Sequence, residues 1–251
     1  MVKVIPVAGS SGSGKTTFIR TLIPLLARYG PVGTIKHAGR HAMEIPHGKD
    51  TTIMYEAGAA AVAGINGEKT LITLNSTSLP DTLEILVGHG IETAVIEGFK
   101  SSPWPKVVIG DLDVDGCVLR NPEPADVIGS MDRFLDYTTL AEILRDMKSA
   151  CGDEDDYALV TYSDGIFPLP GGNPPSLDEE MLSSLAEWAE EIPGVIAARV
   201  AFQHGTPFGG RDEILVAIAA ENGDLAAAAL VRTLSRCRGD LYSSGVSLRS
   251  G

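Results

Sequence analysis

The segment GSSGSGKT at residues 9–16 constrains the fold more than any other part of the sequence. It fits the pattern G-x-x-x-x-G-K-[S/T] at every defined position, directly after the apolar segment 2–8 and at the start of the helix-like segment 15–30. A strand, a glycine-rich turn and a helix in this order form a phosphate-binding loop. Glycines let several backbone N–H groups converge on one anion, and the helix dipole favours negative charge there. The sequence therefore predicts a site for a nucleoside triphosphate.

Two side chains of this loop have expected roles of their own. The Lys15 ammonium would reach the β- and γ-phosphates, and the Thr16 hydroxyl would bind the Mg²⁺ that bridges them. The residues expected to surround the phosphates are Gly9, Ser10, Ser11, Gly12, Ser13, Gly14, Lys15 and Thr16. Because the chain has no N-K-x-D guanine-reading motif, the motifs leave GTP and ATP both open.

Two carboxylates are candidates for binding this magnesium ion. Glu97 lies near the end of the apolar segment 93–99, and parallel sheets bind ligands beyond the carboxyl ends of their strands. Because glutamate is longer than the usual aspartate, Glu97 would alternatively act on a metal-bound water, so Lys15 and Glu97 are the candidate catalytic residues. Asp50 begins a predicted helix, where it either caps the N-terminus or holds Mg²⁺.

Three histidines lie between residues 34 and 51, and this segment has three interpretations. A zinc site would use His37, His41 and His47, but no cysteine is near and glycines and a proline interrupt any helix there. A purely solvated loop is the second interpretation. The third, which we favour, is a loop that borders the phosphate site and delivers Lys36 and His37 to its rim.

Residues 1–150 alternate strand-like and helix-like segments, which predicts an α/β domain with a mainly parallel sheet covered on both faces. The expected strands cover 2–8, 31–37, 60–65, 70–74, 93–99, 106–111 and 125–130, and the expected helices cover 15–30, 50–59, 80–90 and 138–150. Strand 31–37 is expected beside strand 2–8, and Gly30 is expected to end the first helix. An acidic composition break at 149–157 marks the expected domain boundary.

A small α+β domain is expected over residues 157–251. Its predicted strands are 158–165, 195–202 and 213–220. Its predicted helices run from Ser176 to Pro193, starting with a capping box, and over 224–238, stopping at Gly239.

Four motifs occur in order in the first domain: GSSGSGKTT, TIKH, HGKDT followed by EAGA, and VIEGFK with PK shortly after. Together they resemble the MobB family, the GTP-binding accessory proteins of molybdopterin guanine dinucleotide biosynthesis. The resemblance implies a P-loop NTPase fold, GTP with Mg²⁺, weak hydrolysis and a homodimer. It also implies work beside a MobA-like molybdopterin guanylyltransferase and other cofactor-synthesis proteins, with molybdopterin as a further ligand. Residues Gly9 to Thr17 would hold phosphates, and Asp50 and Glu97 would serve the metal. At His47 this chain departs from the family, which usually has proline there.

Residues 157–251 resemble a shortened MoaE, the large subunit of molybdopterin synthase. The likeness rests on ALVTYSDG, the long helix, VAFQHGTPFGGRDEILVAIAA and the alanine-rich helix after it. Where that family has a His-Arg pair, residues 222–224 read Asn-Gly-Asp, and no lysine follows Lys148. Arginine cannot replace a lysine amine as a nucleophile, because its pKa stays above about 12. We therefore expect no synthase activity, and a domain that binds the pterin, a partner or a second copy.

His204 is expected to be structural or a pterin contact. The arginines that could still bind phosphate are Arg236, Arg238 and Arg249.

The charge distribution argues against nucleic acid and anionic membranes as partners. Residues 1–150 carry 14 basic and 17 acidic side chains, whereas residues 151–251 carry 6 and 16, and such an acidic chain is repelled by both. No apolar run reaches the ~18 residues of a membrane span. The three cysteines are far apart, as expected of reduced thiols rather than a disulfide framework. A cytoplasmic location is expected.

Two further functions are compatible with a phosphate loop. A small-molecule kinase would need a lid with several arginines, and the first domain offers only Arg40 near the loop. A scaffold protein would use the nucleotide only to control assembly.

Overall fold

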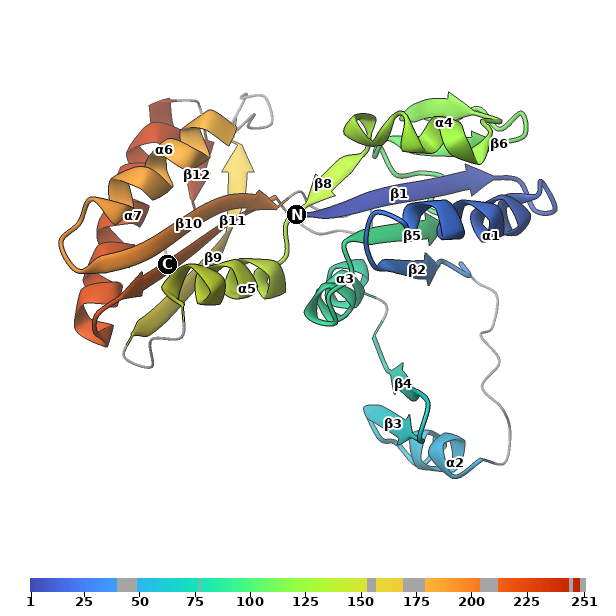
Figure 1. Cartoon of the computed structure of the whole chain (residues 1–251), viewed down its shortest axis with the longest axis horizontal. Helices are drawn as coiled ribbons and strands as arrows, with labels where there is room; N and C mark the ends of the chain where they lie inside the picture. The colour runs from blue at the N-terminus through green and yellow to red at the C-terminus, as the bar shows by residue number, and fades with distance from the viewer. Residues whose placement is uncertain are drawn as a thin grey trace.

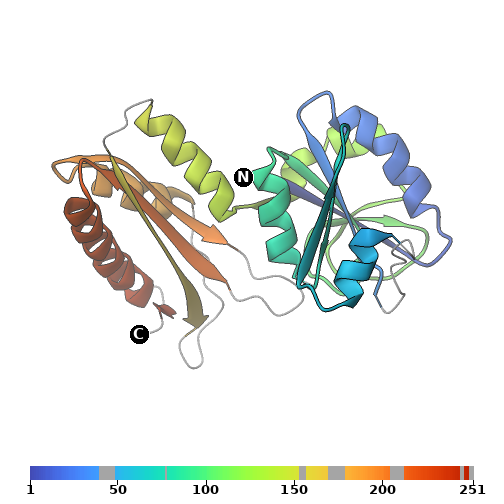
Figure 2. The ribbon, with the colours of Figure 1, turned by 90° about the horizontal axis from the view of Figure 1, so that it is seen from below.

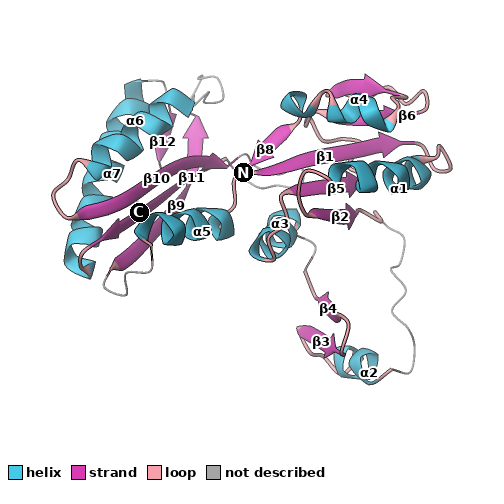
Figure 3. Cartoon of the chain, viewed as in Figure 1, coloured by secondary structure: helices cyan, strands magenta, loops and turns pink. Residues whose placement is uncertain are grey.

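The computed structural model describes residues 1–39, 49–76, 78–152, 157–168, 179–203, 212–243 and 246–248, which form two separate larger sheets (Figures 1 and 3). The first sheet has the strand order β2-β5-β1-β6-β7, all parallel, with β8 antiparallel to β1. Its strands are β1 Val2–Gly9, β2 Val32–Lys36, β5 Thr93–Glu97, β6 Lys106–Ile109, β7 Cys117–Arg120 and β8 Leu135–Tyr137. The mainly parallel α/β sheet predicted from the sequence is confirmed.

Helices cover both faces of this sheet. On one face α1 (Lys15–Leu26) and α4 (Pro124–Ile128) pack over β1, where Ile5 is fully buried. On the other face α3 (Leu79–Gly88) packs over Val4. A short 3₁₀ helix, Met131–Arg133, precedes β8. Because β1 is buried on both faces, its sequence is a nearly continuous apolar run rather than an alternating one.

A small lobe projects from the first domain (Figure 1). It consists of α2 (Asp50–Glu56) and an antiparallel hairpin of β3 (Ala61–Ile65) and β4 (Thr70–Leu74). The two strands were predicted, but they do not join the central sheet. The turn explains why they pair with each other, because Asn66 Oδ1 accepts hydrogen bonds from the backbone at residues 68 and 69. So short a connection allows only an antiparallel pair, whereas a parallel neighbour needs a crossover of a dozen or more residues.

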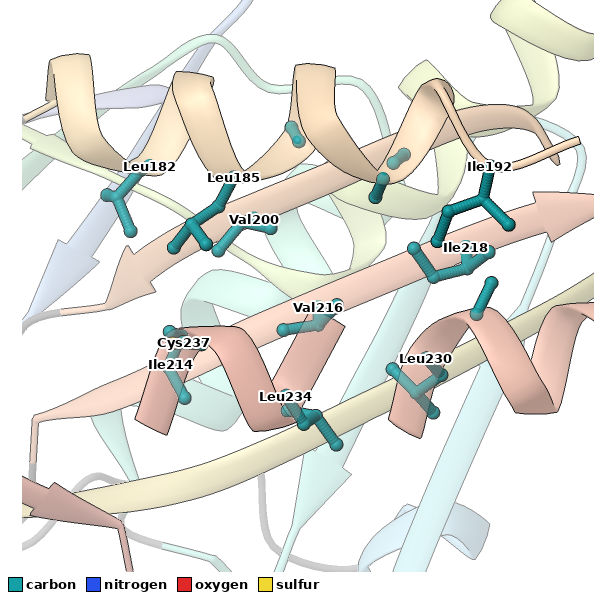
Figure 4. Close-up of a cluster of buried hydrophobic side chains, with 14 residues drawn as sticks. Leu182, Leu185, Ile192, Val200, Ile214, Val216, Ile218, Leu230, Leu234 and Cys237 are labelled. Atoms are coloured by element: carbon teal, nitrogen blue, oxygen red, sulfur yellow. The ribbon is translucent and has the colours of Figure 1, made fainter. Parts of the chain in front are cut away.

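The second sheet is antiparallel, with the strand order β10-β11-β9-β12. Its strands are β9 Ala158–Pro168, β10 Val195–Gln203, β11 Glu213–Ala220 and β12 Val246–Leu248. One face is covered by α6 (Glu179–Glu190) and α7 (Gly223–Ser243), whose leucines meet branched side chains of β10 and β11 in one buried cluster (Figure 4).

Helix α5 (Leu140–Cys151) covers the opposite face of this second sheet (Figure 2). Its fully buried Met147 packs in a cluster with side chains of β10 and β11. The N-terminus of α5 is held by the first domain, since Glu84 of α3 accepts hydrogen bonds from the amides of Leu140 (2.7 Å) and Ala141 (2.9 Å). The expected boundary at 149–157 overlaps the last residues of this helix, which was expected in the first domain but packs on the second sheet.

Three predictions for the first domain were wrong. Residues 125–130 were expected to form a strand, but Pro124 starts α4, and Glu123 and Asp126 form a capping box that favours a helix. Strand β2 pairs with β5 rather than with β1, so β5 lies between them. The first helix ends at Leu26, before Gly30.

Other elements went unrecognised or differ in length. Strands β7 and β8 have only four and three residues, too few for a periodic pattern to appear. Helix α7 continues through Gly239, which was expected to stop it. The predicted capping box begins at Ser176, and residues 176–178 lie outside the described part of the chain.

Candidate phosphate and metal site

The phosphate loop connects the carboxyl end of β1 to the first turn of α1, as predicted. Gly14, immediately before the helix, has φ 93°, a left-handed conformation that favours glycine. At Gly9 a side chain is excluded for another reason, because a Cβ there would lie 2.4 Å from the carbonyl oxygen of Ile109 in β6. The loop is therefore pressed against the neighbouring strand β6.

Two polar groups of the loop are positioned for an anion. Lys15 Nζ donates a hydrogen bond to the carbonyl oxygen of Ser10 at 2.6 Å, so the ammonium folds back over the loop. Ser13 Oγ is buried and has no hydrogen-bond partner among the described residues. A buried hydroxyl without a partner is costly, and a bound phosphate oxygen would satisfy it. Both observations fit the phosphate role predicted for residues 9–17.

Glu97 lies beside the loop, at the end of β5. Thr16 Oγ1 donates a hydrogen bond to Glu97 Oε2 at 3.0 Å. Lys36, paired with Glu97 in the β2–β5 register, places its Nζ 3.8 Å from Glu97 Oε1. A hydroxyl and a carboxylate this close are the hard oxygen donors that Mg²⁺ prefers, so the residues present fit the predicted metal. The structure thus brings together Thr16, Lys36 and Glu97, at the edge of the loop that carries Lys15.

His37 extends this rim by one residue. Its backbone N–H donates to the carbonyl oxygen of Glu97 at 2.9 Å, and its ring stacks on Phe99 with centroids 4.5 Å apart and planes within 9°. Phe99 has φ 55°, unusual for a non-glycine residue. Sequence reasoning missed Phe99, and its position two residues after a strand-end acid was the available signal.

A buried lysine anchors the loop that follows Glu97. Lys106 is fully buried, and its ammonium donates to the carbonyl oxygens of Ser102 and, at 2.8 Å, Asp115. Burial lowers the pKa of Lys106 below its ordinary value, because the charged form loses its hydration. Lys106 therefore holds in place the segment that carries Phe99.

An open groove runs alongside this rim, between α1 and strands β2 and β5. Its volume is about 310 Å³. Its lining residues include Ile19, Ile23, Ile35 and Val95 as an apolar floor, with Thr16, Arg20, Lys36 and Glu97 as polar groups. Arg20 was not among the predicted site residues, although it lies one helical turn beyond Thr16.

The structure does not bring Asp50 to this rim. Asp50 is exposed at the start of α2, in the lobe that stands apart from α1 in Figure 1. Its predicted metal role stays a prediction. His41 and His47 lie outside the described residues, so the zinc interpretation is not tested by geometry. Within the described part, no three His, Cys, Asp or Glu side chains are grouped to hold a metal.

The second domain shows where two of its predicted phosphate-binding arginines lie. Arg236 stacks over the Trp188 ring at 4.6 Å from the centroid, and Arg238 has a buried Nε without a hydrogen-bond partner in the described region. His204 and Arg249 lie outside that region. No helix of the described residues is long and apolar enough to cross a membrane.

The first domain is thus an α/β domain with a mainly parallel sheet, a glycine-rich loop between its central strand and a helix, and a strand-end carboxylate beside that loop. Residues 4–124 match the family model for MobB, "Molybdopterin guanine dinucleotide synthesis protein B". The N-terminal half of the chain is therefore MobB-like, as the motif order predicted. The family match ends before the second sheet, and the likeness of residues 157–251 to MoaE stays a prediction.

Individual relatives agree with the family match. A molybdopterin-guanine dinucleotide biosynthesis adapter protein of Haemophilus influenzae is 36% identical over 113 residues, which is 43% of this chain and 63% of that protein. A probable adapter protein of Bacillus subtilis is 33% identical over 111 residues, 42% of this chain and 64% of that protein. The chain thus spans less than two thirds of these relatives. The crystal structure of Bacillus subtilis MobB aligns with a TM-score of 0.43 and 23% identity, over 53% of this chain and 98% of that one.

Proposed function

We propose that this protein binds GTP with Mg²⁺ in its first domain and acts as an accessory protein in molybdopterin guanine dinucleotide biosynthesis. The observation that carries the proposal is the Thr16–Glu97 hydrogen bond of 3.0 Å at the edge of the phosphate loop. It places a hydroxyl and a carboxylate side by side where a triphosphate-bound cation would lie. The names of the relatives, adapter proteins of that biosynthesis, support the biological role.

Different residues of the site would contact the phosphates and the metal ion. Lys15 would exchange its hydrogen bond to Ser10 for the terminal phosphates, and the amides of the loop would hold the phosphate oxygens. Thr16 and Glu97 would hold Mg²⁺, which supplies charge neutralisation between the phosphates. Glu97 would also orient a water, and the proposed hydrolysis is slow, because Arg20, which lines the same groove, forms no ion pair with Glu97 among the described residues.

A homodimer is part of the proposal. The lobe contributes nothing to the buried hydrophobic clusters of the described residues. It exposes apolar side chains instead, namely Ile53, Met54, Ile65, Leu71, Ile72 and Leu74. A two-stranded hairpin is at best marginally stable by itself, so these side chains favour burial against another surface. A second copy and a MobA-like guanylyltransferase are the proposed partners.

For the second domain we propose a supporting role rather than synthase chemistry. It has no lysine, and neither stacked Arg236 nor half-buried Arg238 can serve as an amine nucleophile. Molybdopterin or a partner protein of the pathway would bind there.

Isothermal titration of the whole protein with GTP and with ATP, each with Mg²⁺, tests the nucleotide proposal. We expect heat with GTP, loss of that heat without Mg²⁺, and affinity at least about tenfold weaker in Lys15→Ala, because a charge-assisted contact is lost. Lys148→Ala, an exposed lysine on α5, is the matched control. If neither nucleotide releases heat or changes the melting temperature, the proposal fails. Co-purification with the guanylyltransferase, with and without GTP, then tests the accessory role.

A further inference from the structure

The predicted metal-binding side chains lie on one side of the phosphate loop, and this determines the direction in which a nucleotide would lie. Thr16 and Glu97 would hold the metal, and with it the terminal phosphates, on the β5 side of the loop. The opposite end of the nucleotide must then lie toward β6 and β7. We propose that Asp111, just after β6, reads the nucleobase and selects guanine. This inference rests on the nucleotide-binding function proposed above.

The end of β6 lies directly against the phosphate loop, and β7 is the next strand of the sheet. The Ile109 carbonyl oxygen is 2.4 Å from a Cβ placed on Gly9, and a Cβ placed on Gly110 would lie 3.5 Å from Ser13 Cβ. Strands β6 and β7 are parallel, with Val108 opposite Arg120, so both end at this edge of the sheet. The segment after Ile109 would therefore lie next to the phosphates, on the side where the nucleobase is expected.

Hydrogen bonds hold the backbone on both sides of Asp111. Arg120 Nη1 donates to the carbonyl oxygens of Gly110 (3.1 Å) and Leu112 (2.9 Å), the residues before and after Asp111. Asn121 Oδ1 accepts a hydrogen bond from Gly110 N–H at 2.6 Å. Asn121 also has φ 46°, a left-handed conformation that is strained for most side chains. These hydrogen bonds hold the exposed turn at Asp111 in one backbone conformation.

Among the acids of this edge, Asp111 is left available. Glu123 and Asp126 are engaged in the capping box of α4. The chain from 110 to 116 runs back toward the start of β7, and by Asp115 it has reached Lys106 at the opposite end of β6. Asp111 is exposed, and its carboxylate makes no hydrogen bond or ion pair with any described residue.

The Asp111 carboxylate and the Asn121 amide nitrogen complement the hydrogen-bonding edge of guanine. A carboxylate offers two acceptor oxygens, which suit the N1–H and 2-amino donors of guanine together. The Asn121 amide nitrogen has no partner among the described residues and can donate to the 6-oxo group. Adenine presents an acceptor at N1 and a donor at its 6-amino group, the reverse of this pattern. The arrangement therefore favours guanine over adenine without an N-K-x-D motif.

Competition titrations of the whole protein with GTP, XTP, ITP and ATP in Mg²⁺ buffer test this assignment. For the wild type we expect GTP to bind at least about tenfold more tightly than ITP, which lacks the 2-amino group, and than ATP. In Asp111→Asn we expect GTP affinity to fall and XTP affinity to rise, each by about tenfold, because xanthine carries an oxo group where guanine carries the amine. Asp113→Asn, two residues further along the same turn, is the matched control.

The outcomes separate the two proposals. No binding of any nucleotide by the wild type would overturn the nucleotide function itself. Equal binding of GTP, ITP and ATP would leave the phosphate site standing and overturn the base assignment. So would an Asp111→Asn protein with an unchanged GTP:XTP preference, or an Asp113→Asn protein with the same switch. The ITP comparison uses the wild-type protein, so it can overturn the inference even if the Asp111→Asn protein fails to fold.

Discussion

Replacing Glu84 with alanine would test how the two sheets are joined. The Glu84 carboxylate on α3 accepts hydrogen bonds from the amides of Leu140 and Ala141, at 2.7 and 2.9 Å. These amides belong to the first turn of α5, where no intrahelical acceptor exists, and a carboxylate there also meets the positive end of the helix dipole. Because α5 packs on the second sheet, this contact ties that sheet to the first domain.

The free energy of unfolding lost in Glu84→Ala can be estimated from these two hydrogen bonds. Removing a charged acceptor costs about 1.5–3 kcal/mol when its donors stay buried, whereas loss of a helix cap costs about 1 kcal/mol. The lower range applies here, because Glu84 is only half-buried and water can reach the released amides. Thr139 Oγ1 also keeps its own hydrogen bond to the α5 amide of Glu142 at 3.2 Å. We expect the free energy of unfolding to fall by about 1–2 kcal/mol, or roughly 3–6 °C in melting temperature.

Urea denaturation followed by circular dichroism measures this change. Glu84→Gln keeps one acceptor oxygen, so its loss should be intermediate. Glu187→Ala is the control, since Glu187 is exposed on α6 and its side chain makes no hydrogen bond among the described residues. A Glu84→Ala protein within about 0.3 kcal/mol of the wild type, or a control that loses as much, would refute the reasoning.

Three further predictions follow from burial and close approach. Burial raises the pKa of Tyr137 above its ordinary value, so the unfolded chain ionises first. Stability should fall as pH rises through about 10, and urea midpoints at pH 9 and 11 should show a smaller drop in Tyr137→Phe. Leu185→Ala, at 2% exposure in the second core, should lower the free energy of unfolding by about 2–5 kcal/mol in the same assay. Gly9→Ala places a Cβ 2.4 Å from the Ile109 carbonyl oxygen and should abolish GTP heat in titration. Gly67→Ala, with nothing within 4 Å, should leave that heat unchanged.

The local elements of the site could be predicted from the sequence because their causes are local. A glycine-rich turn between an apolar strand and a helix folds in one way at residues 9–16, and the structure has that turn. The position of Glu97 at a strand end followed from its place after an apolar run, and it does lie beside Thr16. Helix α4, Pro124–Ile128, was missed although its capping box is present in the sequence, because the short apolar run at 125–130 was interpreted as a strand.

Arrangement in space was decided by contacts between segments far apart in the chain. The insertion of β5 between β1 and β2, the separation of the α2 lobe from the phosphate loop, and the packing of α5 on the second sheet each depend on which surfaces bury best together. No local pattern encodes that choice. The sequence by itself determined the phosphate-binding loop and the mainly parallel first sheet, because backbone sterics and hydrophobic periodicity act over a few residues. Only the tertiary structure decided which carboxylates stand beside the loop, because side chains distant in sequence meet only after the core has packed.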